Sequence, residues 1–291
     1  MLILEIPGLA QDLEPRAYSP SPVGLNFLVL GFGYSTGSVL VDPSLPVSNV
    51  KANLNIPTAG YGRTFGLLGR QSLLTVGLPY VWGDISGDVG EQRRNIRRSG
   101  LADLRMKFSI NLHGNPARSP EEFAQLWKRS FAVGASLAVQ APSGQYDPAK
   151  LINIGTNRWA FNPQIGVSYP FKKRLELDLY FGTWLYTHNT DFFPGKQLRL
   201  QDPVTELQGH VSYTFRTRLW IAGDINWYRG GATTINHGPP IGEQNNSRAG
   251  VTFSAPFGTK QSVKIAYSDG TVARIGSNFK TVSVGWQYAW F

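Results

Sequence analysis

The chain has 291 residues, of which 42% are hydrophobic and only 16% are charged, whereas soluble domains carry roughly 25% charged residues. It contains no cysteine, which excludes thiol catalysis, disulfide bonds and cysteine-ligated metals. The formal net charge of +9 does not indicate nucleic-acid binding, because the basic residues are scattered and the densest group is Arg93-Arg94 with Arg97-Arg98.

The first 22 residues have the pattern of an exported chain. Met1 to Ala10 is apolar and ends in Gly8-Leu9-Ala10, a small-residue motif typical of a signal-peptide cleavage site, although no basic region precedes it. An ordinary unstructured N-terminus would look the same. Residues 14–22 are rich in proline, and we expect them either to block an entrance of the domain that follows or to remain unattached.

From residue 24 onward, the sequence repeats segments of roughly ten residues in which apolar and polar side chains alternate. Within residues 102–112, for example, Leu104 and Phe108 alternate with Arg105 and Lys107. Because successive side chains of a strand point to opposite faces, each segment predicts a strand with one apolar and one polar face. The segments are residues 24–34, 52–67, 73–82, 102–112, 131–139, 159–169, 175–185, 205–215, 219–227, 249–257, 263–267 and 282–290.

The connections between these segments alternate between short and long. The short ones are residues 69–70, 170–173, 216–217 and 258–260, and the long ones, rich in Gly, Asn, Asp and Pro, are residues 84–99, 142–158, 188–203 and 230–247. Short turns on one rim and long loops on the other are typical of bacterial transmembrane barrels. No stretch approaches the ~20 continuous apolar residues of a transmembrane helix, so a chain of this kind that spans a membrane must do so as a closed barrel.

The sequence therefore predicts an all-β fold, a transmembrane antiparallel up-and-down β-barrel of about 12 strands. We assign residues 1–22 to a signal-peptide remnant and a Pro-rich periplasmic leader, and residues 23–291 to the outer-membrane β-barrel. One connection on the short-turn side, residues 113–129, is longer than a hairpin turn. It contains Ser119-Pro120-Glu121-Glu122, which predicts a helix that begins with a capping box.

The last segment carries a further feature of outer-membrane barrels. Val282, Val284, Trp286, Tyr288 and Trp290 fall on one face of the predicted strand. An alternating terminal strand that closes on an aromatic residue resembles the signal read by the bacterial barrel-assembly machinery. We assign this signal to Gly285, Tyr288, Trp290 and Phe291, and we expect the assembly machinery and the lipid bilayer of the outer membrane as partners.

Several short sequence motifs of this chain also occur together in one known family. They are residues 16–20 (RAYSP), 22–24 (PVG), 77–80 (GLPY), 100–103 (GLAD), 142–147 (PSGQYD), 151–163, 245–250, 267–270 (YSDG) and 287–290 (QYAW). On these motifs the chain resembles the outer-membrane transporter family of the MetA pathway of phenol degradation. The resemblance implies a barrel in the bacterial outer membrane, reached by export through the periplasm, and a transport role with no particular substrate.

Motifs for catalysis are missing from the sequence. It has no Gly-x-Ser-x-Gly elbow, no His-Glu-x-x-His pair and no phosphate-binding glycine loop. Three of the four histidines fall in turns or loops, and His210 lies on a polar strand face that would point into a barrel, away from lipid. We therefore expect no enzyme, no catalytic or metal-binding residue and no cofactor.

The polar strand faces are the first candidate for a functional site, because they would line the solute path. They contribute Asp103, Arg105, Lys107, Glu176, Asp178, Glu206, Gln208, His210, Asp224 and Asn226. Either opposite charges pair across the narrow lumen and fill it, or they set the electric field of a water-filled path.

The second candidate is the long connection after residue 142, which would form a constriction if it folds inward. Its candidate residues are Tyr146, Asn153, Asn157 and Arg158. The alternative is a surface loop that is tied down by its own Asn side chains.

The function predicted from these features is passive uptake of small organic solutes, aromatic or hydrophobic, across the outer membrane. The hydrophobic character of the solute follows from the family resemblance alone. The net charge of +9 favours an alternative, a diffusion porin that prefers anions, and a sealed structural barrel is the third. Neutralising Arg105 and Lys107 would abolish an anion channel but not hydrophobic uptake. A small-molecule solute is thus an expected partner, and nucleic acid is not.

Overall fold

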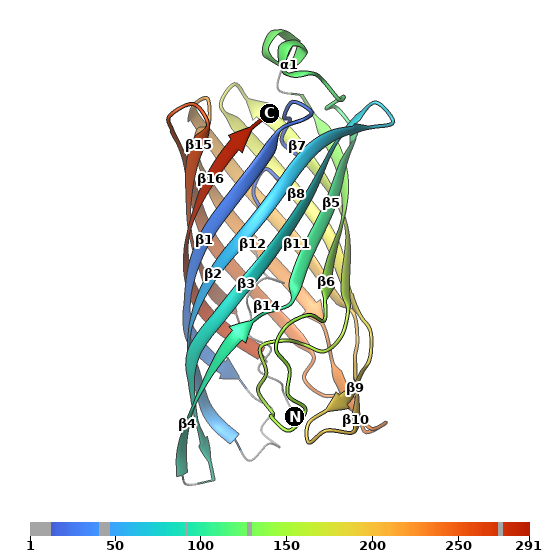
Figure 1. The fold of residues 1–291 in the computed structure, drawn as a ribbon, viewed down its shortest axis with the longest axis vertical. Helices are drawn as coiled ribbons and strands as arrows, with labels where there is room; N and C mark the ends of the chain where they lie inside the picture. Colours follow the sequence, from blue (N-terminus) through green and yellow to red (C-terminus); the bar gives the residue numbers. More distant parts are fainter. Residues whose placement is uncertain (1–12, 41–46, 91, 127–129, 273–275) are drawn as a thin grey trace.

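A computed structural model describes residues 13–40, 47–90, 92–126, 130–272 and 276–291. The predicted signal remnant at Met1 to Ala10 lies outside these residues. Within them, one sheet of thirteen strands closes on itself as an antiparallel barrel (Figure 1). Two of these strands, β4 and β5, pair end to end with the same strand, β3. The wall therefore has twelve strand positions, and the predicted up-and-down barrel is confirmed.

Neighbouring wall strands follow one another along the chain, and β1 closes the barrel on β16. The strands are β1 (Asn26–Leu40), β2 (Val47–Leu67), β3 (Arg70–Val89), β4 (Gln92–Leu101), β5 (Leu104–His113), β6 (Ala132–Ala141), β7 (Ala160–Lys172), β8 (Leu175–Tyr186), β11 (Val204–Arg216), β12 (Leu219–Gly230), β14 (Gln244–Phe257), β15 (Gln261–Val272) and β16 (Gly276–Trp290). A small second sheet outside the wall consists of β9 (Asn189–Phe192), β10 (Gln197–Gln201) and β13 (Thr233–Ile235).

Side-chain alternation gives the wall two different surfaces. On β8, Leu179 and Phe181 point outward and are each 52% exposed, whereas Asp178 and Tyr180 point inward and are buried. The same alternation leaves large apolar side chains exposed around the outside of the barrel. Monomeric soluble proteins rarely expose so much apolar surface, but a membrane barrel presents an apolar band of about 25 Å to lipid. The exterior therefore suits a bilayer.

The short turns and the long connections lie at opposite ends of the barrel. Figure 1 shows the C-terminus and α1 at one end, and β4, β9 and β10 at the other. The turns at Gly69 and Gly258 place these residues at φ of +73° and +69°, a conformation that glycine adopts without a steric penalty. We call the two ends the short-turn rim and the long-loop rim.

The predicted helix is confirmed as α1 (Pro120–Leu126) at the short-turn rim. Its capping box is complete, because the Ser119 N–H donates to Glu122 Oε2 (2.9 Å) and the Glu122 N–H donates to Ser119 Oγ (3.2 Å). Among the described residues, no helix has the length and apolar character needed to cross a bilayer.

Three of the predicted long loops contain strands. Residues 84–99 are not a loop, because β3 and β4 continue as a paired hairpin in which Asp88 lies opposite Arg93, with 3.1 Å between carboxylate and guanidinium. The loop prediction was wrong because it relied on apolar lipid-facing side chains, which this segment lacks. Cross-strand pairs of opposite charge also stabilise paired strands, and they do so here. Residues 188–203 likewise contain β9 and β10, and residues 230–247 contain β13.

The seam of the barrel joins its first and last strands, from Asn26 opposite Trp290 to Leu40 opposite Gly276. The Trp286, Tyr288 and Trp290 rings stack along the outside of β16, with centroid distances of 6.3 and 5.8 Å. The residues assigned to the assembly signal, Gly285, Tyr288, Trp290 and Phe291, thus lie near the short-turn rim at this seam.

Candidate functional site

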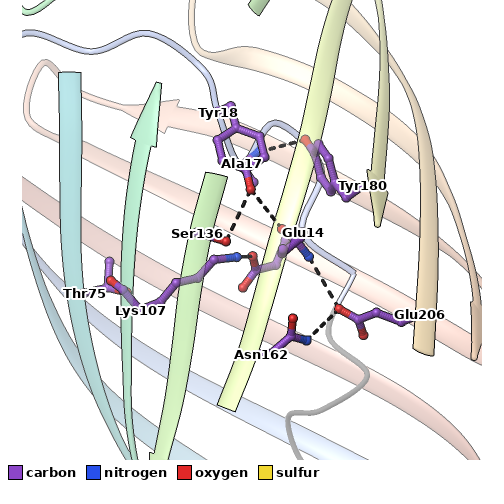
Figure 2. Close-up of polar contacts among 10 residues, drawn as sticks. Glu14, Ala17, Tyr18, Thr75, Lys107, Ser136, Asn162, Tyr180 and Glu206 are labelled. Atoms are coloured by element: carbon purple, nitrogen blue, oxygen red, sulfur yellow. Dashed lines mark hydrogen bonds and ion pairs between the residues drawn. The ribbon is translucent and has the colours of Figure 1, made fainter. Parts of the chain in front are cut away.

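The lumen contains the first described segment of the chain, residues 13–24, which we call the leader. Figure 2 shows Glu14, Ala17 and Tyr18 of the leader beside side chains of the wall. Within the leader, Glu14 forms an ion pair with Lys107 of β5. From there the leader runs toward the short-turn rim, where β1 begins.

Tyr18 is embedded in the wall, with only 2% of its surface exposed. Its hydroxyl lies within hydrogen-bond distance of Ser136 Oγ (3.3 Å) and Gln164 Oε1 (3.2 Å). Its ring lies against Gly134 of β6 and Gly166 of β7, where an added Cβ would come within 2.0 and 2.5 Å of ring atoms. Glycine at these two strand positions therefore creates the space that Tyr18 fills, and we call it the Tyr18 socket.

Arg16 attaches the leader to a neighbouring part of the wall. Its backbone N–H donates to Asp178 Oδ2 (3.2 Å), and its side-chain Nε donates to Ser212 Oγ (2.9 Å). The next residue, Ala17, donates its N–H to the Tyr180 hydroxyl (3.1 Å). Together with Tyr18, these contacts connect the leader to four adjacent strands, β6, β7, β8 and β11.

Other lumen carboxylates have local hydrogen-bond partners. Glu206 accepts a hydrogen bond from Asn162 Nδ2 (2.9 Å). Asp224 Oδ1 lies 2.8 Å from His210 Nδ1, and Asp224 Oδ2 accepts a hydrogen bond from Thr252 Oγ1 (2.7 Å). Such donors offset part of the cost of burying a carboxylate.

The structure places the predicted path residues on inward-facing strand positions, with the exception of Asp103. These residues are Arg105, Lys107, Glu176, Asp178, Glu206, Gln208, His210, Asp224 and Asn226, from β5, β8, β11 and β12. The residues that hold the leader, above all Arg16 and Tyr18, were not among the predicted site residues. The available signal was glycine at positions 134 and 166, inside segments predicted to be strands.

Asp103 lies at a break in the wall, between the end of β4 and the start of β5. Its carboxylate accepts hydrogen bonds from the Gly144 N–H (2.8 Å), the Thr156 N–H (3.0 Å), Thr156 Oγ1 (2.6 Å) and Gln140 Nε2 (2.8 Å). Gly144 and Thr156 belong to the connection of residues 142–158. Asp103 therefore anchors this connection and does not line the central lumen.

The connection of residues 142–158 folds over the inside of the barrel near the long-loop rim. Its Ile154 is 8% exposed and belongs to one apolar cluster with Leu54 of β2 and Phe279 of β16, both of which point inward. At its end, the Arg158 guanidinium lies 4.3 Å from the centroid of the Tyr186 ring.

The other candidate constriction residues give this connection its shape. Asn153 Nδ2 donates to the Lys150 carbonyl (2.8 Å), and Asn157 Nδ2 donates to Asn189 Oδ1 (3.0 Å). The Tyr146 hydroxyl donates to a backbone carbonyl of β9 (3.1 Å), and burial raises its pKa. The connection is thus tied down by Asn side chains and also lies across the barrel mouth.

Two cavities lie beside the leader inside the barrel. One has a volume of about 210 Å³ and is lined by Lys107, and the other has a volume of about 380 Å³ and is lined by Arg248 and Lys264. Glu14 and Thr58 line both cavities and therefore lie between them. Among the described residues, no group of three or more His, Asp or Glu side chains could hold a metal ion.

Comparison with known proteins places the chain beside outer-membrane barrels. Residues 31–270 match the family model described as "Putative MetA-pathway of phenol degradation". No curated protein sequence matches the chain. The solved COG4313 outer membrane channel from Pseudomonas putida F1 is similar over 96% of this chain and 100% of that one, with a TM-score of 0.80 and 19% identity.

Two autotransporter domains are also similar in structure. The transport unit of AIDA-I from Escherichia coli matches over 96% of this chain and 93% of its own, with a TM-score of 0.57 and 10% identity. The beta domain of the Bordetella autotransporter Brka matches over 91% of this chain and 99% of its own, also with a TM-score of 0.57 and 10% identity. At these identities the similarity concerns the fold.

Proposed function

Because the chain belongs to the family described as "Putative MetA-pathway of phenol degradation", we propose that it is an outer-membrane channel for the passive uptake of small organic solutes that are aromatic or otherwise hydrophobic. The solved channel from Pseudomonas putida F1 has the same fold, and the apolar exterior suits a bilayer. In this proposal, the barrel-assembly machinery inserts the chain by reading the end of β16, and the protein moves its solute without reacting with it.

An apolar patch on the inner wall carries the proposal. Inward-facing Leu54, Ile56, Val81 and Ile85 of β2 and β3 form a buried cluster in the half of the barrel near the long-loop rim. Ile154, in the connection of residues 142–158, covers this patch on its lumen side. The interior of a water-filled porin is polar, so an apolar inner wall at the entrance favours a solute that leaves water readily.

The solute route proposed here is narrowed at two places, the connection of residues 142–158 and the leader. A solute that passes the connection anchored by Asp103 would reach the apolar patch and then the cavities of about 210 and 380 Å³. It would leave past the leader, which Tyr18 holds in its socket. The larger cavity, of about 380 Å³, suits a single small molecule, since small-molecule sites span roughly 300–1,000 Å³.

Two other functions have support in particular observations. Arg105, Lys107, Arg248 and Lys264 line the lumen cavities, and a row of cations favours a diffusion channel that prefers anions. The dense attachment of the leader favours the sealed structural barrel.

Solute entry into proteoliposomes tests the proposal. Val81→Thr adds one hydroxyl to the apolar patch with little change in shape, and Val251→Thr makes the same change on the outer face, where Val251 is 48% exposed. We expect Val81→Thr to slow the entry of benzyl alcohol about fivefold, equivalent to about 1 kcal/mol, and Val251→Thr to leave it unchanged.

Three results would contradict the proposal. Equal rates in the two variants would show that the patch does not contact the solute. A steady anion-selective current that disappears when Arg105 and Lys107 are neutralised would establish the anion channel instead. A folded wild-type barrel that admits no solute would favour the sealed barrel.

A further inference from the structure

We propose that the lumen binds small organic acids, and that the carboxylate of the ligand replaces Glu14 as the partner of Lys107. This inference rests on the proposed transport function and names the solute class, aromatic monocarboxylates. Glu14 then acts as the leader's own substitute for the ligand carboxylate, and it occupies the site until a ligand arrives.

The Glu14 carboxylate is paired and yet accessible. It forms an ion pair with Lys107 inside the barrel (Figure 2). The Glu14 side chain is nevertheless 45% exposed, against 21% for Lys107. Because the wall surrounds this pair, the exposed part of Glu14 faces the two cavities that it lines. A ligand carboxylate can therefore approach Lys107 from a cavity without moving the wall.

A second cation acts on the same carboxylate from another strand. Lys264 of β15 lines the larger cavity together with Glu14, and its charge attracts the Glu14 carboxylate. Arg248 of β14 lines this cavity as well. A ligand carboxylate at this place would be attracted by Lys107 and Lys264, whereas a neutral solute would gain little from either charge.

Exchange of the Glu14 carboxylate at Lys107 leaves the other contacts of the leader in place. Arg16 and Tyr18 hydrogen-bond to Asp178 and Gln164 of the wall, and these contacts do not involve Glu14. When one carboxylate replaces another, Lys107 remains paired, which avoids the penalty of an unpartnered buried charge. A neutral solute cannot make this exchange, so it would pass the site with the Glu14–Lys107 ion pair intact.

Part of the larger cavity can contact an aromatic ring, although Ser and Thr side chains such as Ser35, Thr252 and Thr281 also line it. Val29, Ile56 and Ala266 line it with apolar side chains, and Gly31 and Gly33 line it without side chains. Its volume of about 380 Å³ lies within the range of small-molecule sites, roughly 300–1,000 Å³. The site thus combines a cationic end with an apolar body, as an aromatic monocarboxylate requires.

Isothermal titration calorimetry with the purified full chain in detergent micelles tests this inference. The probes are benzoate and benzamide, which share a ring and differ in charge. We expect the wild type to bind benzoate about tenfold more tightly than benzamide, because one charge-assisted contact contributes about that factor. Equal affinities for the two probes would overturn the inference.

Substitutions at the two ends of the ion pair should act in opposite directions. Glu14→Gln removes the competing carboxylate and should tighten benzoate binding about fivefold. Lys107→Gln should abolish the preference for benzoate, and Lys107→Arg should retain it. Lys280→Gln removes an equal charge on the outer surface, where the Lys280 side chain is 64% exposed, and should change neither affinity.

A purely structural ion pair would respond differently, since losing either partner would disturb the leader in the same way. Weaker benzoate binding in Glu14→Gln, in a variant whose heat-dependent electrophoretic mobility shows a folded barrel, would therefore overturn the inference.

Entry into proteoliposomes separates this inference from the proposed function. If benzyl alcohol enters and calorimetry shows no preference for benzoate, the inference fails and the proposed function stands. If neither benzyl alcohol nor benzoate enters, the proposed function fails, and calorimetry alone decides whether the carboxylate site exists.

Discussion

The Asp103 carboxylate holds both ends of one connection, at Gly144 and at Thr156. It is 3% exposed, and a buried carboxylate is stable only when donors surround it. The base of the connection is also tightly packed, since a Cβ on Gly155 would lie 2.6 Å from the Gly144 backbone. A single side chain at the break in the wall thus fixes the position of residues 142–158.

Asp103→Asn should release this connection. An amide offers one acceptor oxygen and turns its NH₂ group toward other donors, and each lost hydrogen bond to a charged group is worth about 1.5–3 kcal/mol. We expect protease added to intact cells to cleave residues 142–158 in this variant while the barrel stays folded. Asp269→Asn, whose ion pair with Lys280 lies on the outer surface, is the control, and equal cleavage of both variants would contradict the assigned role of Asp103.

Each strand of the wall has one face toward the outside of the barrel and the other toward the lumen. On β11, Val211 and Phe215 face outward and are 51% and 48% exposed, whereas His210 and Ser212 face inward and are buried. A shift of one residue in register would exchange these faces. The apolar exterior therefore fixes the register, and the register fixes which polar groups reach the lumen.

The effect of an outward charge on β11 should depend on its depth. Val211→Arg places a guanidinium near the middle of the strand and should reduce the free energy of unfolding by about 2–4 kcal/mol, whereas Phe215→Arg near the short-turn rim should cost about 0–1 kcal/mol. Denaturant titration in lipid vesicles measures both values. Equal losses would mean that the bilayer does not cover the wall as its apolar side chains indicate.

At the scale of the whole molecule, the wall and the leader together determine whether the lumen is open. The wall is closed by the seam between β1 and β16, so its strand pairing is complete without the leader. The leader occupies the interior through its contacts with β6, β7, β8 and β11. Conductance should therefore respond to changes in the Tyr18 socket that leave the wall intact.

Gly134→Ala should open the lumen. The new Cβ would lie 2.0 Å from the Tyr18 ring, so the ring must leave its socket, and we expect the single-channel conductance to rise severalfold. Gly77→Ala is the matched control, because a Cβ on this strand glycine meets no other atom within 4 Å. The same conductance in both variants would show that Tyr18 does not restrict the path.

The wall could be predicted from the sequence because alternation is a local pattern, as in Leu177, Leu179 and Phe181. The outer hairpin of β3 and β4 could not, because it extends beyond the lipid-facing wall and its strand pairing depends on charged side chains such as Asp88 and Arg93. Alternation identified which side chains point inward, but it contained no information on what they contact.

The leader was the main feature that the sequence could not place. Tyr18 meets Ser136 and Gln164 across 118 and 146 residues of chain, and no local pattern records a contact over such a distance. Glycine within a strand indicates a close approach, but positions 134 and 166 could not identify Tyr18 as the approaching side chain.

The Tyr18 socket also imposes an order of events during folding. Gly134 and Gly166 are register partners on β6 and β7, so the socket does not exist until these two strands have paired. The leader therefore docks late, after the part of the wall that receives it, and contacts between residues so distant along the chain form slowly. Until that step, the space that Tyr18 fills between these two strands and the lumen is open to water.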